Sequence, residues 1–431
     1  MVRDALSIAR SPLTFLERVV ARHGDLVAFP SPRGAVLLVN DPAGVRRVLQ
    51  DNPRGYGKDT VQYRSLAAVT GQGLLTADGD TWREHRRLVQ PAFHHGALAG
   101  LAEAAVGAGL RLRERWDAAH PAPVDADAAL MAEMLTLVGR TFFAADLDPA
   151  AGGIVTAVDG ALRLLVRRAR SPVPRRWPTP SRHRLRRAVR TVDGAVEALL
   201  AGRRALPPGR APDDVLGLLL AAHAQGALTD RGVRDEIVTL VIAGYETVAS
   251  SLTWTLGLLA DHPGAQDALA AEVDALGGVP SWTDLPRLPY TRAVLDEALR
   301  LYPPAWALTR RALAEDRVAG VSIPAGTLVI ISPWLLHRRE VDWPEPDRFD
   351  PGRFLGRSPG TAAPRGGYLP FGLGPRLCIG RDVALTEAVL VLATLLRGRR
   401  VHRPDGARAP AVDALVTLRP RGGLPLVLTR S

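Results

Sequence analysis

Residues 371–380 read FGLGPRLCIG and include Cys378, the only cysteine of this 431-residue chain. The glycines and the proline favour a tight loop, and apolar residues at helical spacing follow at Val383–Leu396. A cysteine directly before a helix, with arginine nearby and loop amides able to donate to its sulfur, favours the thiolate that binds metals. An isolated cysteine is more often a small buried apolar residue. Here the surrounding ten residues favour a metal ligand instead.

A second pattern places opposite charges on one helix face. Glu297 and Arg300 lie three residues apart, between apolar neighbours in residues 295–301. Such a pair is expected to be buried, and a buried ion pair needs further hydrogen-bond partners to offset its desolvation. We therefore expect another arginine or backbone carbonyl groups to complete it.

The longest helix signal begins at Thr229-Asp230, a capping pair, and runs to Asp261, before Pro263. At 1.5 Å per residue this helix would be about 48 Å long. Its segment 237–260 holds a single charge, Glu246, and could span a bilayer by length. The alternative is a helix buried on all sides in a large domain. The chain shows no second span, and residues 1–30 hold no long apolar stretch, so we expect a buried helix and a cytoplasmic protein without an N-terminal anchor.

Composition narrows the class of protein further. Hydrophobic residues make up 47% and charged residues 23%, which is typical of a globular chain with a large core. One cysteine excludes a disulfide framework and a multi-cysteine zinc site. The net charge of +11 would suit nucleic acid, an anionic membrane or an acidic partner. Coding bias toward arginine is the simpler explanation, since Lys58 is the only lysine, and the arginine-rich stretch 163–190 lacks nucleic-acid motifs.

Local patterns predict a mainly helical fold with small β-sheets, organised as a single domain over residues 1–431. Predicted elements are a helix from Ser11-Pro12, a hairpin of Leu26–Phe29 with Ala35–Val39 around residues 31–34, a helix from Asp41-Pro42, an irregular glycine-rich loop over 52–80, mostly helix over 82–205, proline-rich breaks at 171–180 and 205–212, and strands at 318–331 and 414–428.

Five motifs together resemble those of the cytochrome P450 family, soluble bacterial type. The cysteine loop has every fixed position of the family's FxxGxRxCxG pattern. The other motifs are ExxR at Glu297–Arg300, [AG]Gx[DE]T at Ala243–Thr247, WxxxR at Trp82–Arg86, and a variant of PERF at Asp350–Phe354 with Gly352 where glutamate is common. All five follow the family's order, and the resemblance extends from about residue 11 to 428.

This resemblance implies the cytochrome P450 fold with haem b between the helix 229–261 and the cysteine loop 371–380. Cys378 would be the axial thiolate and metal ligand, and Arg353 would join Glu297 and Arg300 in a structural triad. The implied cofactor-binding residues are Trp82, Arg86, Arg311, Phe371, Arg376 and Cys378. Arg311 is preferred over Arg310 because it lies five residues before Asp316, the spacing usual in the family.

The resemblance also implies that Glu246 and Thr247 form the catalytic acid–alcohol pair that feeds protons during oxygen reduction. Ala243 and Thr247 are four residues apart and share one face of the helix. The threonine hydroxyl can bond back to the carbonyl of Ala243. We expect this bond to loosen the helix there and to open a groove for dioxygen and water.

The implied activity is a haem-thiolate monooxygenase that hydroxylates or epoxidises a substrate with O₂. Electrons would come from NAD(P)H through a reductase and an acidic ferredoxin that docks over the cysteine loop, near Arg376 and Arg381. The chain holds no GxGxxG motif of a fused flavin domain. Two alternatives remain open: a peroxide-driven peroxygenase or isomerase on the same fold, and a non-catalytic haem sensor.

Positions that match the family's substrate-contact regions are mostly apolar. The candidates are Tyr63, Leu240, Ala243, Ala305, Trp306, Leu308 and Val416. Burial of an apolar ligand there would gain about 25 cal/mol per Å². A compact terpenoid of secondary metabolism is therefore the expected substrate, and about half of these side chains are expected only to pack the core.

Overall fold

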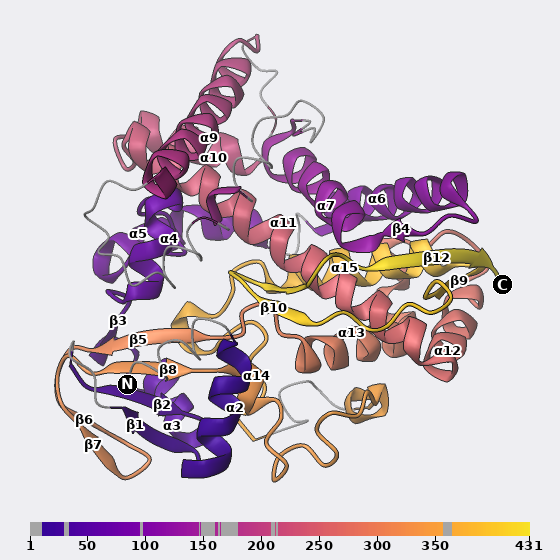
Figure 1. Ribbon diagram of the computed structural model, residues 1–431. Coiled ribbons are helices and arrows are strands. Elements are labelled where there is room, and N and C mark those ends of the chain that lie inside the picture. The colour runs from indigo at the N-terminus through magenta and orange to yellow at the C-terminus, as the bar shows by residue number, and fades with distance from the viewer. Residues whose placement is uncertain are drawn as a thin grey trace.

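The computed structural model describes residues 11–29, 34–94, 98–145, 180–207, 214–356 and 364–431, with the isolated positions 147, 160–162, 164 and 212. Its helices are α2 (Pro12–His23), α3 (Pro42–Arg46), α4 (Val61–Thr70), α5 (Gly79–Val89), α6 (Leu98–Ala119), α7 (Ala126–Phe143), α9 (Pro180–Arg204), α10 (Val215–Ala224), α11 (Asp230–Asp261), α12 (Pro263–Asp274), α13 (Pro289–Leu301), α14 (Pro333–Leu336) and α15 (Arg381–Leu396). Figure 1 shows most of these helices packed around α11, with a sheet and α2 beside them. The predicted mainly helical fold with small sheets is confirmed.

The largest sheet has the strand order β1-β2-β8-β5-β3. Its strands are β1 (Leu26–Phe29), β2 (Val36–Val39), β8 (Leu328–Ile331), β5 (Leu308–Ala312) and β3 (Tyr56–Gly57). The pair β2–β8 is parallel, and the other pairs are antiparallel. The register confirms the predicted N-terminal hairpin, although its turn at residues 31–33 lies outside the described residues.

The smaller sheets come mostly from the C-terminal third of the chain. The three-stranded sheet joins β4 (Val124–Asp125), β12 (Pro425–Arg430) and β9 (Arg399–His402). Two hairpins are formed by β6 (Asp316–Val318) with β7 (Val321–Ile323) and by β10 (Val412–Ala414) with β11 (Leu418–Pro420). Strands were expected at 318–331 and 414–428, and the sequence patterns missed β5, β9 and the two-residue strands β3 and β4.

The long helix matches its prediction closely. Thr229 caps α11 by accepting a hydrogen bond from Gly232 N at 3.0 Å, and the helix ends at Asp261. Among the described helices, α11 is the one long and apolar enough to cross a membrane, but 83% of its apolar window is buried inside the protein. The helix therefore has the environment of a core helix, because its apolar residues contact other helices rather than solvent.

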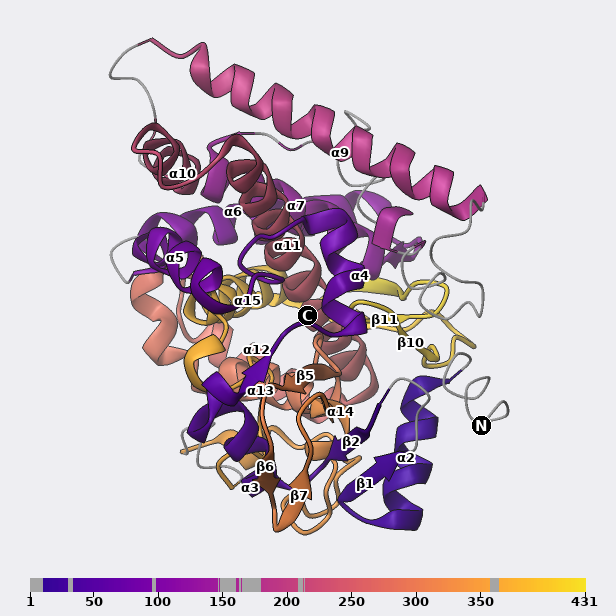
Figure 2. The same cartoon turned by 90° about the vertical axis from the view of Figure 1, so that its left-hand side faces the viewer.

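One expectation about local structure was wrong. Residues 52–80 do not form one irregular loop, because Thr60 accepts a hydrogen bond from Tyr63 N and starts α4. The helix expected from Ser11-Pro12 is α2, which begins at Pro12 without a capping hydrogen bond from the Ser11 side chain. The arginine-rich stretch 163–190 is described mainly from residue 180, where it forms the first part of α9 along the outer edge (Figure 2). The proline-rich segment 171–179 lies outside the described residues.

Candidate active site

The cysteine loop is closed by its own backbone. Cys378 N donates to Phe371 O at 2.9 Å, and the ring of Phe371 packs against the main helical core. Gly374 has a φ of +74°, and a Cβ there would lie 2.1 Å from the carbonyl oxygen of Leu49. Only glycine fits this close approach to a neighbouring backbone. The loop therefore delivers Cys378 at a fixed position directly before α15.

Cys378 is accessible to solvent, and the Gly380 N–H, Arg86 and Arg381 lie near its sulfur. Burial raises the pKa of its thiol, while the Gly380 N–H and the charge of Arg86 act in the opposite direction. In the protein alone, the expected preference for thiolate is therefore outweighed by desolvation. A bound cation would reverse this balance, because a coordinating thiol loses its proton to the metal.

Four cationic side chains from separate segments meet close to this loop. Lys58 Nζ donates to Leu75 O at 2.7 Å and lies 4.9 Å from the ring centroid of Tyr63. Burial and the nearby charges of Arg310, Arg376 and Arg86 lower the pKa of Lys58. Asp78 is close to this cluster, but one carboxylate does not balance four cations. The cluster therefore has the electrostatics of a site for carboxylate groups.

Each arginine of this cluster is also positioned by the backbone or by a ring. Arg86 Nη1 donates to Leu377 O at 2.9 Å, next to the cysteine. The guanidinium of Arg376 lies 4.3 Å from the ring centroid of Trp82, donates to Ala77 O and pairs with Asp78. The predicted residues Trp82, Arg86 and Arg376 are thus brought together.

The structure does not place Arg311 in this cluster. Its side chain donates to Asp59 O and Gly326 O, at 2.8 Å each. The buried neighbour Arg310 points the other way and donates to Tyr63 Oη at 3.1 Å. The spacing to Asp316 misled the choice, because Asp316 pairs with Arg47 instead. Lys58 was missed, although a single lysine in an arginine-rich chain was a usable signal.

The two predicted catalytic residues lie on α11 with different partners. Thr247 Oγ1 donates to Ala243 O at 2.7 Å, as expected, but α11 continues through this point without a break. Glu246 is buried and accepts a hydrogen bond from Thr417 Oγ1 at 2.9 Å. Ala243 is exposed on a helix whose neighbouring residues are almost all buried. The Ala243–Thr247 face of α11 is therefore less covered by neighbouring side chains than the rest of the helix.

The buried ion pair of Glu297 and Arg300 has the additional hydrogen-bond partners that were expected to offset its desolvation. Arg300 forms two hydrogen bonds with Glu297, of 2.6 and 2.8 Å, and both side chains are fully buried. It also donates to the carbonyl groups of His337, Pro346 and Arg348. Arg353 Nε lies 3.4 Å from Glu297, so all three residues of the expected triad are neighbours.

The expected substrate-contact residues divide into two groups. Ala243, Ala305, Leu308 and Val416 are at least partly accessible. Tyr63 instead belongs to the cation cluster, Leu240 is buried in the core, and Trp306 donates from its indole to Leu415 O at 3.0 Å. Leu308 and Val416 also pack against the hydrophobic cores with part of their surface, so a role in substrate contact stays a prediction for these residues.

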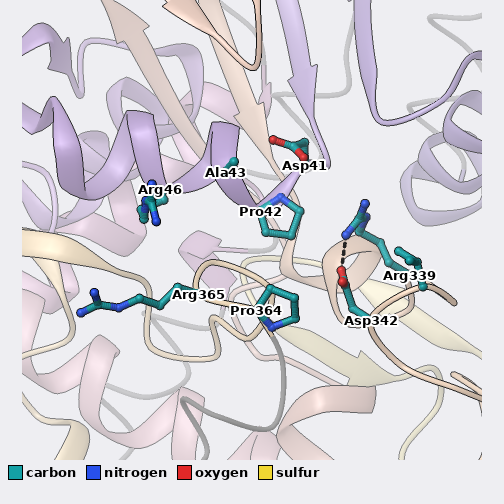
Figure 3. A pocket seen from close by; sticks show the side chains of 9 residues that line it. Asp41, Pro42, Ala43, Arg46, Arg339, Asp342, Pro364 and Arg365 are labelled. Atoms are coloured by element: carbon teal, nitrogen blue, oxygen red, sulfur yellow. Dashed lines mark hydrogen bonds and ion pairs between the residues drawn. The ribbon is translucent and has the colours of Figure 1, made fainter.

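A separate cavity of about 380 Å³ lies between the start of α3 and the segments 339–342 and 364–365. Its lining residues are Asp41, Pro42, Ala43, Arg46, Arg339, Val341, Asp342, Pro364 and Arg365 (Figure 3). Arg339 pairs there with Asp342 and with Asp25, and Arg46 pairs with Asp51. The cavity shares no residue with the cysteine site, and these charges are largely balanced, so the active site is elsewhere.

Comparison with known proteins identifies the family of this chain. The family model described as cytochrome P450 matches residues 5–425. The chain is 38% identical to cyclooctatin synthase of Streptomyces melanosporofaciens, over 93% of this chain and 87% of that protein. It is 35% identical to pentalenene oxygenase of Streptomyces avermitilis, over 96% and 93% of the two chains.

The fold also matches that of solved structures. The crystal structure of CYP175A1 from Thermus thermophilus superposes with a TM-score of 0.79 at 33% identity, covering 98% of this chain and 96% of that one. A cysteine loop before α15, a buried Glu297–Arg300 pair and a long core helix with a glutamate–threonine pair are therefore found in a chain that belongs to the cytochrome P450 family.

Proposed function

We propose that this cytochrome P450 monooxygenase hydroxylates or epoxidises a compact terpenoid, with electrons delivered from NAD(P)H by a ferredoxin and its reductase in the cytoplasm. The enzyme class follows from the family and from relatives named as monooxygenases or oxygenases. One observation carries the substrate class: the accessible residues Ala243, Ala305, Leu308 and Val416 are all apolar. The name pentalenene oxygenase, carried by a relative, denotes oxidation of an unsaturated hydrocarbon and supports this choice.

The residues around the cysteine loop fit the haem of this family. Cys378 offers a single sulfur ligand for the iron, and Lys58, Arg86, Arg310 and Arg376 offer an excess of positive charge for the propionates. We propose Arg310 in this role in place of Arg311, because only Arg310 reaches the cluster. The haem supplies oxygen activation, and the thiolate ligand favours cleavage of the O–O bond. We propose that the whole chain acts as one domain, with the haem between α11 and the cysteine loop.

The protein's own contribution is to exclude water and to place protons. We expect the accessible apolar residues, among them Ala243 and Val416, to contact the substrate without charged anchors, so that shape and burial orient it. The carboxyl group of Glu246 would transfer protons inside the fold, where it is buried and hydrogen-bonded to Thr417. The Thr247 hydroxyl donates to Ala243 O, so on the accessible face of α11 its oxygen is an acceptor for a further hydrogen bond.

Removal of the Thr247 hydroxyl should separate oxygen consumption from product formation. We expect Thr247→Ala to consume NADPH and O₂ and to release more hydrogen peroxide and less product. Glu246→Gln should instead slow turnover by about 10²-fold, the usual contribution of a positioned proton donor. Product, peroxide and NADPH are measured in parallel. Equal yield of product per NADPH in wild type and Thr247→Ala would contradict this role.

Spectral titration of the haem-loaded protein tests the substrate class. We expect cyclic sesquiterpenes or diterpenes to shift the ferric spectrum from low to high spin, because they displace water from an apolar site. Fatty acids and glycosylated macrolides serve as comparison ligands. A shift given only by the macrolide would show that the substrate class is wrong. Turnover with ferredoxin, reductase and NADPH, compared with turnover by peroxide, distinguishes a monooxygenase from a peroxygenase and from a haem sensor.

The electron donor is expected to be acidic, although not because of Arg376. That side chain faces the interior, whereas Arg381 at the start of α15 is exposed. We expect reduction by an acidic ferredoxin to weaken as ionic strength rises, and Arg381→Glu to reduce the rate at low salt. Arg317→Glu is a matched control, because Arg317 is exposed on the β6–β7 hairpin at the far corner of the molecule (Figure 1). A reduction rate insensitive to salt would rule out this docking mode.

A further inference from the structure

The hairpin of β10 and β11 is joined to α11 by a row of three side chains. Glu246, Ser250 and Trp254 lie four residues apart and therefore form one stripe along the helix. Glu246 accepts from Thr417 Oγ1 at 2.9 Å, whereas Ser250 and Trp254 donate to the carbonyl of Leu418 at 2.6 and 3.0 Å. These three hydrogen bonds all join α11 to the consecutive hairpin residues Thr417 and Leu418.

The same hairpin is held from other directions as well. Trp306 donates to Leu415 O at 3.0 Å, and Arg419 pairs with Asp127 of α7 at 2.6 Å. The turn itself is closed by Leu415 N, which donates to the carbonyls of Asp413 and Thr417. These contacts restrict the backbone of the hairpin and so hold Thr417 against α11. The Thr417 side chain is buried.

These contacts give the Thr417 hydroxyl a role distinct from that of its neighbours. The bonds of Ser250 and Trp254 end on a backbone carbonyl and therefore only fasten the hairpin. The bond of Thr417 ends on the carboxylate of Glu246 and fixes where that carboxylate lies. A buried carboxylate with a long side chain can adopt several rotamers, and a hydrogen bond from a rigid donor selects one of them.

We propose that Thr417 is a positioning residue for proton delivery: its hydroxyl, held by the β10–β11 hairpin, orients Glu246 beside Thr247. This proposal rests on the proposed monooxygenase function. It also links the wall of the substrate site to the acid, because Val416 precedes Thr417 in the same tight turn. Because β11 contacts α11, the position of the hairpin would set both the placement of Glu246 and that of Val416.

Three substitutions test the proposal in the haem-loaded enzyme. Thr417→Val removes the hydroxyl and keeps the shape, Thr417→Ser keeps the hydroxyl, and Thr255→Val makes the same exchange in α11, where the hydroxyl bonds only to Ser251 O. We expect Thr417→Val to lower kcat roughly tenfold, part of the about 10²-fold that a positioned proton donor contributes. The substrate KM and the melting temperature should stay near those of Thr255→Val, and Thr417→Ser should restore kcat.

An infrared measurement on the resting ferric enzyme gives a readout independent of turnover. The Glu246 carboxyl band is identified by its loss in Glu246→Gln. We expect this band to shift in Thr417→Val and to stay in place in Thr417→Ser and Thr255→Val. An unshifted band, or a kcat equal to wild type in Thr417→Val, overturns the positioning role. If wild-type enzyme forms no product with any donor while the band still shifts, the proposed function fails and the Thr417–Glu246 contact stands.

Discussion

Replacement of Cys378 by serine is expected to abolish the strongly red-shifted absorption band of the reduced carbonyl complex and to reduce product formation to background. Cys378 is the only cysteine in the chain, so no other thiol can substitute for it. A serine oxygen keeps the hydrogen-bond geometry of the loop but lacks the electron donation of a thiolate, which favours cleavage of the O–O bond. The measurement is the carbonyl difference spectrum, together with product analysis.

The fold of this variant provides the control. The backbone bond from Cys378 N to Phe371 O does not involve the side chain, so the loop and the far-ultraviolet circular dichroism should be unchanged. A Cys378→Ser protein that binds haem, keeps the wild-type carbonyl spectrum and still forms product would refute the ligand assignment.

The second large effect concerns stability. Arg300→Leu is expected to destabilise the protein by about 3–5 kcal/mol, because it leaves the fully buried carboxylate of Glu297 without its main partner. The carbonyl groups of His337, Pro346 and Arg348 also lose a donor. Denaturant unfolding of the haem-loaded protein measures the free energy, and poor yield of folded protein is the expected practical sign.

A substitution in an exposed ion pair serves as the control. It shows how much of the loss of stability in Arg300→Leu is due to burial of the pair. Arg348 and Glu345 form a pair at the same three-residue spacing, but both side chains are well exposed. Arg348→Leu should therefore change the free energy of unfolding by only about 0–1 kcal/mol. Similar stabilities of Arg348→Leu and Arg300→Leu would mean that the buried pair has no special weight in this fold.

Features that depend on a few neighbouring residues could be predicted from the sequence. The loop around Cys378, the cap at Thr229 and the pair Glu297–Arg300 rely on local backbone geometry and short spacings. These patterns identified the family and the long core helix before any contact was known, and they predict Cys378 as the metal ligand. The need for extra partners around Arg300 could also be inferred, because burial of an ion pair without them is unfavourable.

Side-chain direction was decided by tertiary structure. Arg310 and Arg311 are adjacent in β5, where successive residues point to opposite faces, so only the pairing of β5 with β8 determines which one faces the site. In the same way, Arg376 turns inward because Trp82 and Asp78 are brought to it from α5 and the residue before it. Lys58 meets three arginines, and Thr417 meets Glu246 across 171 residues of chain. Sequence spacing does not predict these tertiary contacts, because they form only when separate helices and strands pack into one core.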